Sequence, residues 1–254
     1  MKFESDLSDK KMPNNCCTGQ VMMLLRSLLF NIAFWLLILC IGLGGLPFTL
    51  VYRPFSFVVA RGWAKGSLWL LRVLCNIRYE IKGAEYIPDY PALIASKHQS
   101  AWDTIIFWAL LEKPAFVLKR ELIFFPVFGW YLIFLQNIYI DRKSGASAMK
   151  KMLREARERS LQGRPIVIFP EGTRTLPGSS KPYHPGVAAL YQNLNIPVVP
   201  VALNSGKLWQ KNAFVKKPGV ITIEFLPPLL QSSYKSRDFL ALLQKNIEEH
   251  SNRL

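Results

Sequence analysis

One histidine and one aspartate lie close together in a segment with few other reactive side chains. In KHQSAWDT, residues 97–104, His98 precedes Asp103 by five positions. A carboxylate bonded to one ring nitrogen of an imidazole leaves the other nitrogen free as a general base. The pair predicts a base that takes a proton from a substrate hydroxyl as it attacks an activated carbonyl. A nucleophilic Ser100 is less favoured, since no G-x-S-x-G turn surrounds it, and a loop histidine without chemistry is the plainer alternative.

More polar residues directly follow short apolar runs that have the length of buried strands. Lys119 follows AFVL, Arg142 ends NIYIDR, and EGTR (171–174) follows PIVIF. In the last segment Gly172 lets a ligand approach the backbone, and turn N–H groups beside Arg174 form an anion-binding concavity. Cations that gather where strands end predict a phosphate-bearing substrate. The three histidines of the chain are too dispersed to form a metal site.

The elements that must position these residues alternate between strands and helices. Apolar runs at 92–96, 115–118, 138–140, 165–169 and 197–203 predict buried strands, while 77–82 and 220–225 alternate as half-exposed strands do. Between 138–140 and 165–169, a helix is predicted by the spacing of Ala146, Met149, Leu153 and Ala156, and Gly163 ends it. This pattern predicts an α/β domain, a mostly parallel sheet flanked by helices, whose ligands bind beyond the carboxyl ends of strands.

Three further segments flank the predicted site. The run 122–134 (LIFFPVFGWYLIF) could accept an apolar tail or be a buried helix, and His184 precedes a predicted helix as a structural or entrance residue. We expect a last helix from Ser236, as N-cap, to His250, with no chemistry of its own.

The N-terminal region predicts membrane attachment. No charged residue occurs from Ser27 to Tyr52, which is long enough to span about 30 Å of hydrocarbon. Glycines and Pro47 interrupt its second half, so a helix that ends near Leu43 is as plausible as a straight span. A core helix or a signal peptide is less favoured. The sequence divides into an N-terminal membrane-anchoring helical segment, 1–75, and an α/β domain, 76–254.

Charge indicates the partner of the chain. The net charge is +15 although half of the residues are hydrophobic, which predicts an anionic partner. The cations are spread through an apolar chain, which favours an acidic membrane surface over nucleic acid. More Lys and Arg follow the apolar segment than precede it, which places the α/β domain in the cytoplasm. The cysteines show no metal-ligand spacing and suit a reduced compartment; lipidation of Cys16 and Cys17 is a minor alternative.

The motifs taken together resemble a known family. KHQSAWD, LKREL followed by Pro126 and Gly129, NIYIDR, FPEGTR and IPVVPVALNSG occur in this order between residues 75 and 230. They closely resemble the four-block pattern of the glycerolipid acyltransferases, specifically the 1-acyl-sn-glycerol-3-phosphate acyltransferases. The first block begins with Lys97, where the family often has Asn, and this departure could alter the site entrance.

The resemblance implies both an activity and the residues that perform it. An acyl chain would pass from acyl-CoA or acyl-carrier protein, as co-substrate and without another cofactor, to lysophosphatidate, giving phosphatidate. His98 would be the base and Asp103 its orienting partner. The remaining residues would bind the acceptor phosphate: Lys119, Arg142, Glu171, Gly172, Thr173 and Arg174. Another lysophospholipid or glycerol 3-phosphate as acceptor, or a membrane protein that binds anionic lipid without turnover, stays open.

Overall fold

The sheet has seven strands and is built as the sequence predicts. The computed structural model describes residues 15–141, 144–230 and 235–254. Its strands are β1 (Ile77–Lys82), β2 (Leu93–Ser96), β3 (Ala115–Lys119), β4 (Ile138–Ile140), β5 (Ile166–Ile168), β6 (Val198–Leu203) and β7 (Gly219–Phe225). They lie in the order β1-β7-β6-β2-β5-β3-β4. Of the pairings between these described strands, only that of β6 with β7 is antiparallel. The prediction of a mostly parallel sheet is confirmed.

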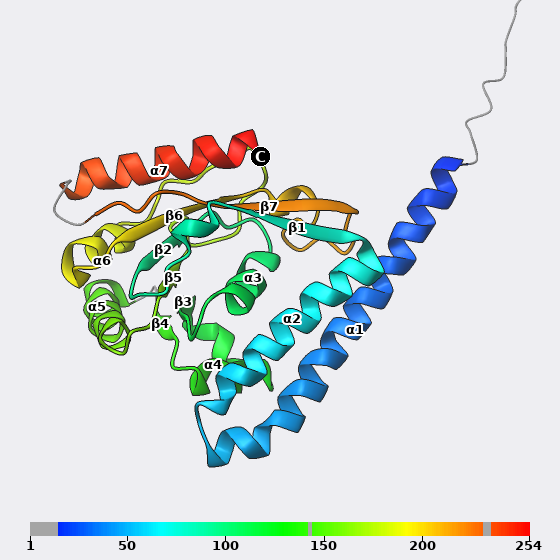
Figure 1. Ribbon diagram of the computed structural model, residues 1–254, viewed down its shortest axis with the longest axis horizontal. Helices are drawn as coiled ribbons and strands as arrows, with labels where there is room; N and C mark the ends of the chain where they lie inside the picture. The colour runs from blue at the N-terminus through cyan, green and yellow to red at the C-terminus, as the bar shows by residue number, and fades with distance from the viewer. Residues whose placement is uncertain (1–14, 142–143, 231–234) are drawn as a thin grey trace, which may run out of the picture.

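Helices cover both faces of this sheet (Figure 1). They are α1 (Asn15–Val51), α2 (Phe55–Cys75), α3 (Trp102–Leu110), α4 (Phe128–Phe134), α5 (Gly145–Leu161), α6 (Gly186–Leu194) and α7 (Ser236–Arg253). Short 3-10 turns lie at Ala84–Tyr86 (η1), Arg120–Phe124 (η2) and Ser205–Lys207 (η4). The predicted N-cap Ser236 is instead the first helical residue of α7, with Lys235 at the cap and no side-chain cap bond.

Side chains that alternate in direction along the buried strands show which helices pack on each face of the sheet. In β2, Leu93 and Ala95 pack in a cluster with residues of α5, α6 and α7, whereas Ile94 packs with residues of α1, α2 and α3. Successive side chains of a strand point to opposite faces, so a fully apolar strand supplies both clusters. The core therefore has two layers, one on each side of the sheet, and the N-terminal helices belong to one of them.

The helices α1 and α2 form an antiparallel hairpin that lies against the domain (Figure 1). The chain reverses at Tyr52–Pro54, and Arg53 holds the reversal by donating to the backbone oxygens of Ile133 and Phe134. The core cluster contains Phe30 and Ile38 of α1 together with Trp102 of α3. The division expected at residue 75 falls between α2 and β1, yet hydrophobic packing continues across it.

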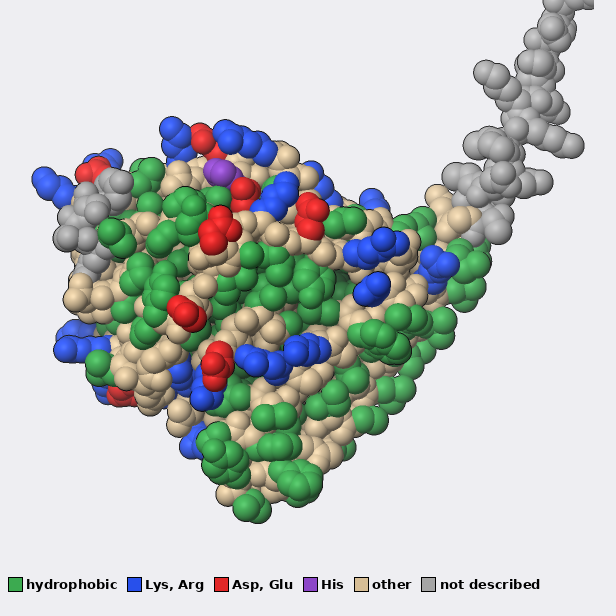
Figure 2. Space-filling model, viewed as in Figure 1, with side chains coloured by type: hydrophobic (Ala, Val, Ile, Leu, Met, Phe, Trp, Pro, Cys, Tyr) green, Lys and Arg blue, Asp and Glu red, His purple; other side chains and the backbone are tan. Residues whose placement is uncertain are grey.

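Much of α1 remains uncovered. From Gly19 to Val51 it is apolar and long enough to cross a membrane, and only 17% of its most apolar window is buried. Trp35, Leu36 and Leu50 are each more than half exposed. Figure 2 shows hydrophobic side chains gathered over the part of the surface that α1 and α2 form. Exposed apolar area of this extent marks a binding surface for lipid or protein.

The expectation of a helix that ends near Leu43 is wrong, because α1 continues through Gly42, Gly44, Gly45 and Pro47 to Val51. The glycines at 42 and 45 lie three residues apart on one helix face and allow neighbours to come close. A Cβ on Gly42 would overlap Val127 Cγ1, and one on Gly45 would lie 2.5 Å from Val59 Cγ2. Packing against α2 and the start of α4 therefore outweighs the weak helix propensity of glycine.

We predict that Gly45→Ala and Gly44→Ala have opposite effects on stability. A Cβ added to Gly44 would have no other atom within 4 Å, so alanine there should add up to ~1 kcal/mol through helix propensity. Gly45→Ala should cost about 1–3 kcal/mol, because Val59 must move out of a packed position. Urea unfolding of the detergent-solubilised variants measures both free energies. Equal stabilisation by the two alanines would contradict close packing at Gly45.

Candidate active site

The predicted edge of the sheet does bring the polar segments together. The strands β2, β3, β4, β5 and β6 run parallel to one another, so their carboxyl ends meet at one edge. His98 follows β2, Lys119 ends β3, and Arg174 follows β5. These three residues line one cavity of about 1200 Å³. Arg142 lies outside the described residues.

His98 and Asp103 are in direct contact. The turn between β2 and α3 folds back so that His98 Nδ1 lies 2.9 Å from Asp103 Oδ2. The ring also stacks on Phe169, with 4.0 Å between the ring centres. These two contacts fix the plane of the imidazole and leave Nε2 free of the carboxylate. The ring borders the cavity, whereas the Asp103 side chain has no exposed surface.

The buried carboxylate of Asp103 is satisfied by three further donors. The backbone N–H groups of Gln99 and Ser100 donate to Oδ2 at 2.7 and 2.8 Å, and the Ser205 hydroxyl donates to Oδ1 at 2.5 Å. Donors that converge on one carboxylate fix its orientation. Ser205 lies in IPVVPVALNSG, but spacing alone did not indicate that its hydroxyl would reach Asp103.

Ser100 is placed as part of the turn. Its side chain is fully buried, and its hydroxyl oxygen accepts a hydrogen bond from the backbone N–H of Trp102 at 3.2 Å. Its backbone N–H meanwhile donates to Asp103. Ser100 does not line the cavity that His98 borders. This position supports its role in shaping the turn, not in attacking a bound ligand.

The last three residues of the EGTR turn line the cavity, whereas the first is buried in the interior. Gly172, with φ of +65°, Thr173 and Arg174 line the cavity. The N–H of Gly172 donates to the Phe169 oxygen at 2.9 Å, so that N–H is already used within the turn. Glu171 is 2% exposed and lies behind the turn, where Thr175 Oγ1 contacts both of its carboxylate oxygens at 3.1 Å. The sequence grouped Glu171 with the phosphate ligands, but the structure points its carboxylate away from the cavity.

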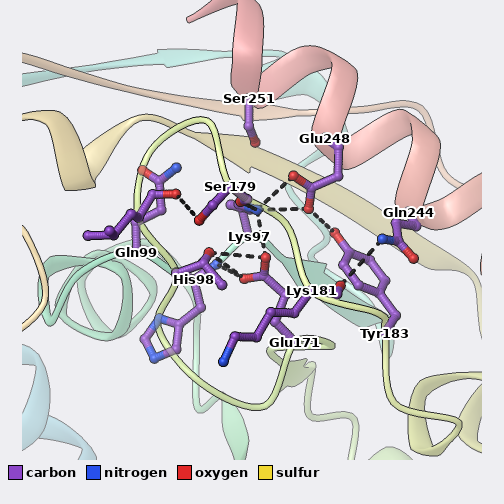
Figure 3. A network of polar contacts seen from close by, with 12 residues as sticks. Lys97, His98, Gln99, Glu171, Ser179, Lys181, Tyr183, Gln244, Glu248 and Ser251 are labelled. Atoms are coloured by element: carbon purple, nitrogen blue, oxygen red, sulfur yellow. Dashed lines mark hydrogen bonds and ion pairs between the residues drawn. The ribbon is translucent and has the colours of Figure 1, made fainter.

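Lys97 is likewise interior. The sequence placed it at the site entrance, but it is 1% exposed, and its ammonium donates to Glu171 Oε1 at 2.6 Å. Figure 3 shows the Lys97 and His98 side chains diverging, so that the imidazole points away from this ion pair. Burial raises the pKa of Glu171, and the ammonium of Lys97 opposes that rise.

The cations that line the cavity have few partners in the protein. Within the described residues, neither the Lys119 nor the Arg174 side chain makes a hydrogen bond or an ion pair, and the Lys211 ammonium reaches only the neutral Thr173 hydroxyl at 3.3 Å. Free cations at a concave, partly apolar surface make a site for an anionic ligand. In the described parts of the chain, no group of three or more His, Cys, Asp or Glu side chains could hold a metal ion.

Lys216 is a further cation of the cavity wall that sequence reasoning missed. Its ammonium donates to Asn31 Oδ1 of α1 at 2.5 Å and to the Phe214 oxygen at 2.9 Å, and it lies 5.3 Å from the centre of the Phe30 ring. Burial lowers the pKa of Lys216 to about 8. The contacts tie the loop after β6 to α1.

Most of the remaining cavity wall is apolar, although His184, Thr104 and Asn212 also line it. It includes Phe34 and Trp35 of α1, Trp63 of α2 and Trp108 of α3. From the 122–134 run, Leu122, Phe125, Phe128 and Leu132 also line it, while Tyr131 is buried and donates to the Gly42 oxygen at 2.8 Å. Part of the run therefore faces the cavity, and part of it is buried in the core. An alkyl chain could lie along this wall, which joins the cavity to the exposed hairpin.

The chain is similar in sequence to known proteins. A family model described as "Acyltransferase" matches residues 78–204. The chain is 41% identical over 184 residues to a 1-acyl-sn-glycerol-3-phosphate acyltransferase of Pseudomonas aeruginosa, covering 72% of this chain and 70% of the relative. It is 32% identical over 158 residues to the enzyme of that name from Limnanthes alba, covering 61% of this chain and 56% of the relative.

A solved structure has the same fold. The crystal structure of the 1-acyl-sn-glycerophosphate (LPA) acyltransferase PlsC from Thermotoga maritima matches with a TM-score of 0.75 and 20% sequence identity. The match covers 90% of this chain and 96% of the other. The match therefore extends beyond the α/β domain into the helical hairpin.

Proposed function

This chain belongs to the acyltransferase family, and on that premise we propose that it transfers a fatty acyl group to the sn-2 hydroxyl of lysophosphatidate, giving phosphatidate for phospholipid synthesis. The observation that carries the proposal is the cavity itself. The imidazole held by Asp103, two unpaired cations and an apolar wall all face one space. Lysophosphatidate has the three matching parts, namely a hydroxyl, a phosphate monoester and an alkyl chain.

His98 acts as the general base in this proposal. Its Nε2 takes the proton of the sn-2 hydroxyl as the hydroxyl oxygen attacks the thioester carbonyl of the donor. A carbon–oxygen bond forms, the carbon–sulfur bond breaks, and the imidazolium returns the proton to the leaving thiolate. Asp103 stabilises the imidazolium and holds the ring with Nδ1 toward the carboxylate. The substrate supplies the nucleophile, so no enzyme serine or cysteine is needed.

The phosphate of the acceptor lies between Lys119 and Arg174 in this arrangement. Arg174 can donate two parallel hydrogen bonds, and Gly172 and Thr173 form the adjacent cavity surface. Arg142 keeps its expected place in this set from sequence alone. Glu171 contributes indirectly, because its carboxylate supports the turn from behind. Glycerol 3-phosphate has no alkyl chain and would leave the apolar wall of the cavity unoccupied. In a lysophospholipid with a larger head group, that group would shield the phosphate from Lys119 and Arg174.

The donor is a thioester, acyl-CoA or acyl-carrier protein, and it serves as co-substrate without a separate cofactor. Both donors carry the acyl chain on the same kind of sulfur, so the chemical step is the same for both. Transfer from oleoyl-CoA and from oleoyl-acyl-carrier protein, measured side by side, distinguishes them.

The helical hairpin attaches the enzyme to the bilayer in which its acceptor and product reside. Exposed apolar residues of α1 would contact lipid, and the cavity wall formed by Phe34 and Trp35 would receive the acceptor chain. The excess of Lys and Arg after α1 supports a catalytic domain on the cytoplasmic side. Protease added outside sealed cells should then leave this domain intact.

We predict that His98→Ala lowers kcat for transfer of a labelled oleoyl group from oleoyl-CoA to lysophosphatidate. Loss of a general base costs about 10²–10⁴-fold, or roughly 3 to 5 kcal/mol of barrier. His250→Ala is the matched control, since His250 also pairs with a carboxylate, Glu224 Oε2 at 3.0 Å, but lies outside the cavity. Unchanged turnover in His98→Ala would refute the base, and no labelled phosphatidate from either thioester donor would refute the proposed function.

We predict that Arg174→Ala and Lys119→Ala each raise the KM for lysophosphatidate about 10- to 100-fold, as expected for loss of a charged hydrogen bond. The KM for the donor should change much less. Lys207→Ala serves as control, because Lys207 is exposed and lies outside the cavity lining. Equal increases in the KM of both substrates would argue against a phosphate site at these cations.

We predict that Leu36→Glu combined with Leu43→Glu releases the enzyme from vesicles that contain acidic phospholipid. These side chains are 53% and 50% exposed on α1, and a carboxylate in the hydrocarbon costs on the order of 3 kcal/mol. Leu161→Glu on α5 is the control, since Leu161 is 80% exposed but lies far along the chain from the hairpin. Sedimentation with the vesicles measures binding, and retention of the double variant would show that α1 is not the lipid contact.

A further inference from the structure

A buried cluster of charges lies directly behind the EGTR turn. The ammonium of Lys97 donates to Glu171 Oε1 at 2.6 Å, to Glu248 Oε1 and Oε2 at 2.8 and 2.7 Å, and to the Ser179 oxygen at 2.9 Å. Figure 3 shows Lys97 between the two carboxylates, with Glu248 reaching down from α7. Three segments distant in sequence therefore meet at one ammonium group.

The charges in this cluster depend on one another. Lys97 and Glu171 have almost no solvent contact, and a buried ion is tolerated only when it is paired and hydrogen-bonded. The Tyr183 hydroxyl adds a donor to Glu248 Oε1 at 3.1 Å. One ammonium shared by two carboxylates holds both of them at defined positions, and neither carboxylate can move without leaving a buried charge less well paired.

Glu171, which this cluster holds in place, contacts both the turn that carries His98 and the turn that carries Arg174. Its Oε2 accepts a hydrogen bond from the His98 backbone N–H at 3.4 Å, and Thr175 Oγ1 contacts both of its oxygens. The Thr175 N–H in turn donates to the His98 oxygen at 2.8 Å. The turn that carries His98 and the turn that carries Arg174 are thus joined by the Glu171 carboxylate and by this direct backbone hydrogen bond.

We propose that Lys97 and Glu248 are positioning residues that set the placement of Arg174 relative to His98 through the Glu171 carboxylate. The inference rests on the proposed function, in which one acceptor molecule must engage both side chains at once. It makes the last helix, α7, part of the support of the active site. The sequence alone suggested an entrance position for Lys97 and no chemistry for α7.

The distinguishing consequence is a dependence on the acceptor phosphate. An acceptor with a phosphate is held by Arg174 while its hydroxyl must reach His98, so a small displacement between the two side chains misaligns the hydroxyl. An acceptor without a phosphate, such as 1-oleoylglycerol, needs only the His98 end of the site. A loss of overall stability would instead affect both acceptors equally.

The test compares Lys97→Met and Glu248→Gln with the native enzyme on lysophosphatidate and on 1-oleoylglycerol. We expect kcat/KM for lysophosphatidate to fall on the order of 10- to 100-fold in Lys97→Met, and by a smaller factor in Glu248→Gln, with 1-oleoylglycerol changed by less than about 3-fold. Glu249→Gln is the control, since Glu249 lies next in the chain on α7, is exposed and pairs with Lys245 at 3.9 Å.

Each outcome has one meaning. A selective loss with lysophosphatidate supports the positioning role. An equal loss with both acceptors, or no loss in either variant at temperatures where circular dichroism shows them folded, overturns it. If Lys97→Met does not fold, Glu248→Gln decides, because it keeps the ion pair of Lys97 with Glu171. Failure of the native enzyme to form phosphatidate would refute the proposed function instead.

Discussion

A carboxylate without access to water must obtain its hydrogen bonds from the protein, and Asp103 imposes this requirement on the active site. Its partners are the His98 ring, two backbone N–H groups of the turn after β2, and the Ser205 hydroxyl of the loop after β6. The ring and the two N–H groups come from the same turn between β2 and α3, whereas Ser205 comes from a distant loop. The requirement therefore links the strand-to-helix turn and the imidazole to the loop after β6, which also contacts the N-terminal helical hairpin.

That loop connects the chemistry with the apolar part of the molecule. After Ser205, the Gly206 N–H donates to Gln99 Oε1 at 2.9 Å, and Trp209 packs edge-on against Phe30 of α1. Lys216 then binds Asn31 of the same helix. One loop thus contacts both the His98–Asp103 pair and α1. The hairpin therefore forms part of the cavity wall in addition to an exposed apolar surface. In the proposed function, a lipid substrate would remain in apolar surroundings until its polar end meets His98.

The two sets of charges at the sheet edge differ in how they are compensated. Behind the EGTR turn, Lys97 faces two carboxylates in a buried cluster, and those charges are used to hold the protein together. In front of it, Lys119 and Arg174 have no described partner and face the cavity. A paired buried charge resists displacement, whereas an unpaired one at a concave surface attracts an anion. The EGTR turn thus lies between a buried ion-pair cluster that stabilises the fold and cations that are free to bind a ligand.

Local patterns in the sequence were sufficient for the strands, the main helices and the His98–Asp103 contact, because each depends on residues a few positions apart. The two-residue alternation of strands and the turn between β2 and α3 are properties of short segments. The tertiary structure alone decided which distant groups meet. Ser205 reaches Asp103 across 102 residues, Glu248 reaches Lys97 across 151, and α1 continues through its glycines because neighbours pack against them. Such contacts follow from the order of strands in the sheet and from which helices share a face, and hydrophobic periodicity within one segment contains no information about either.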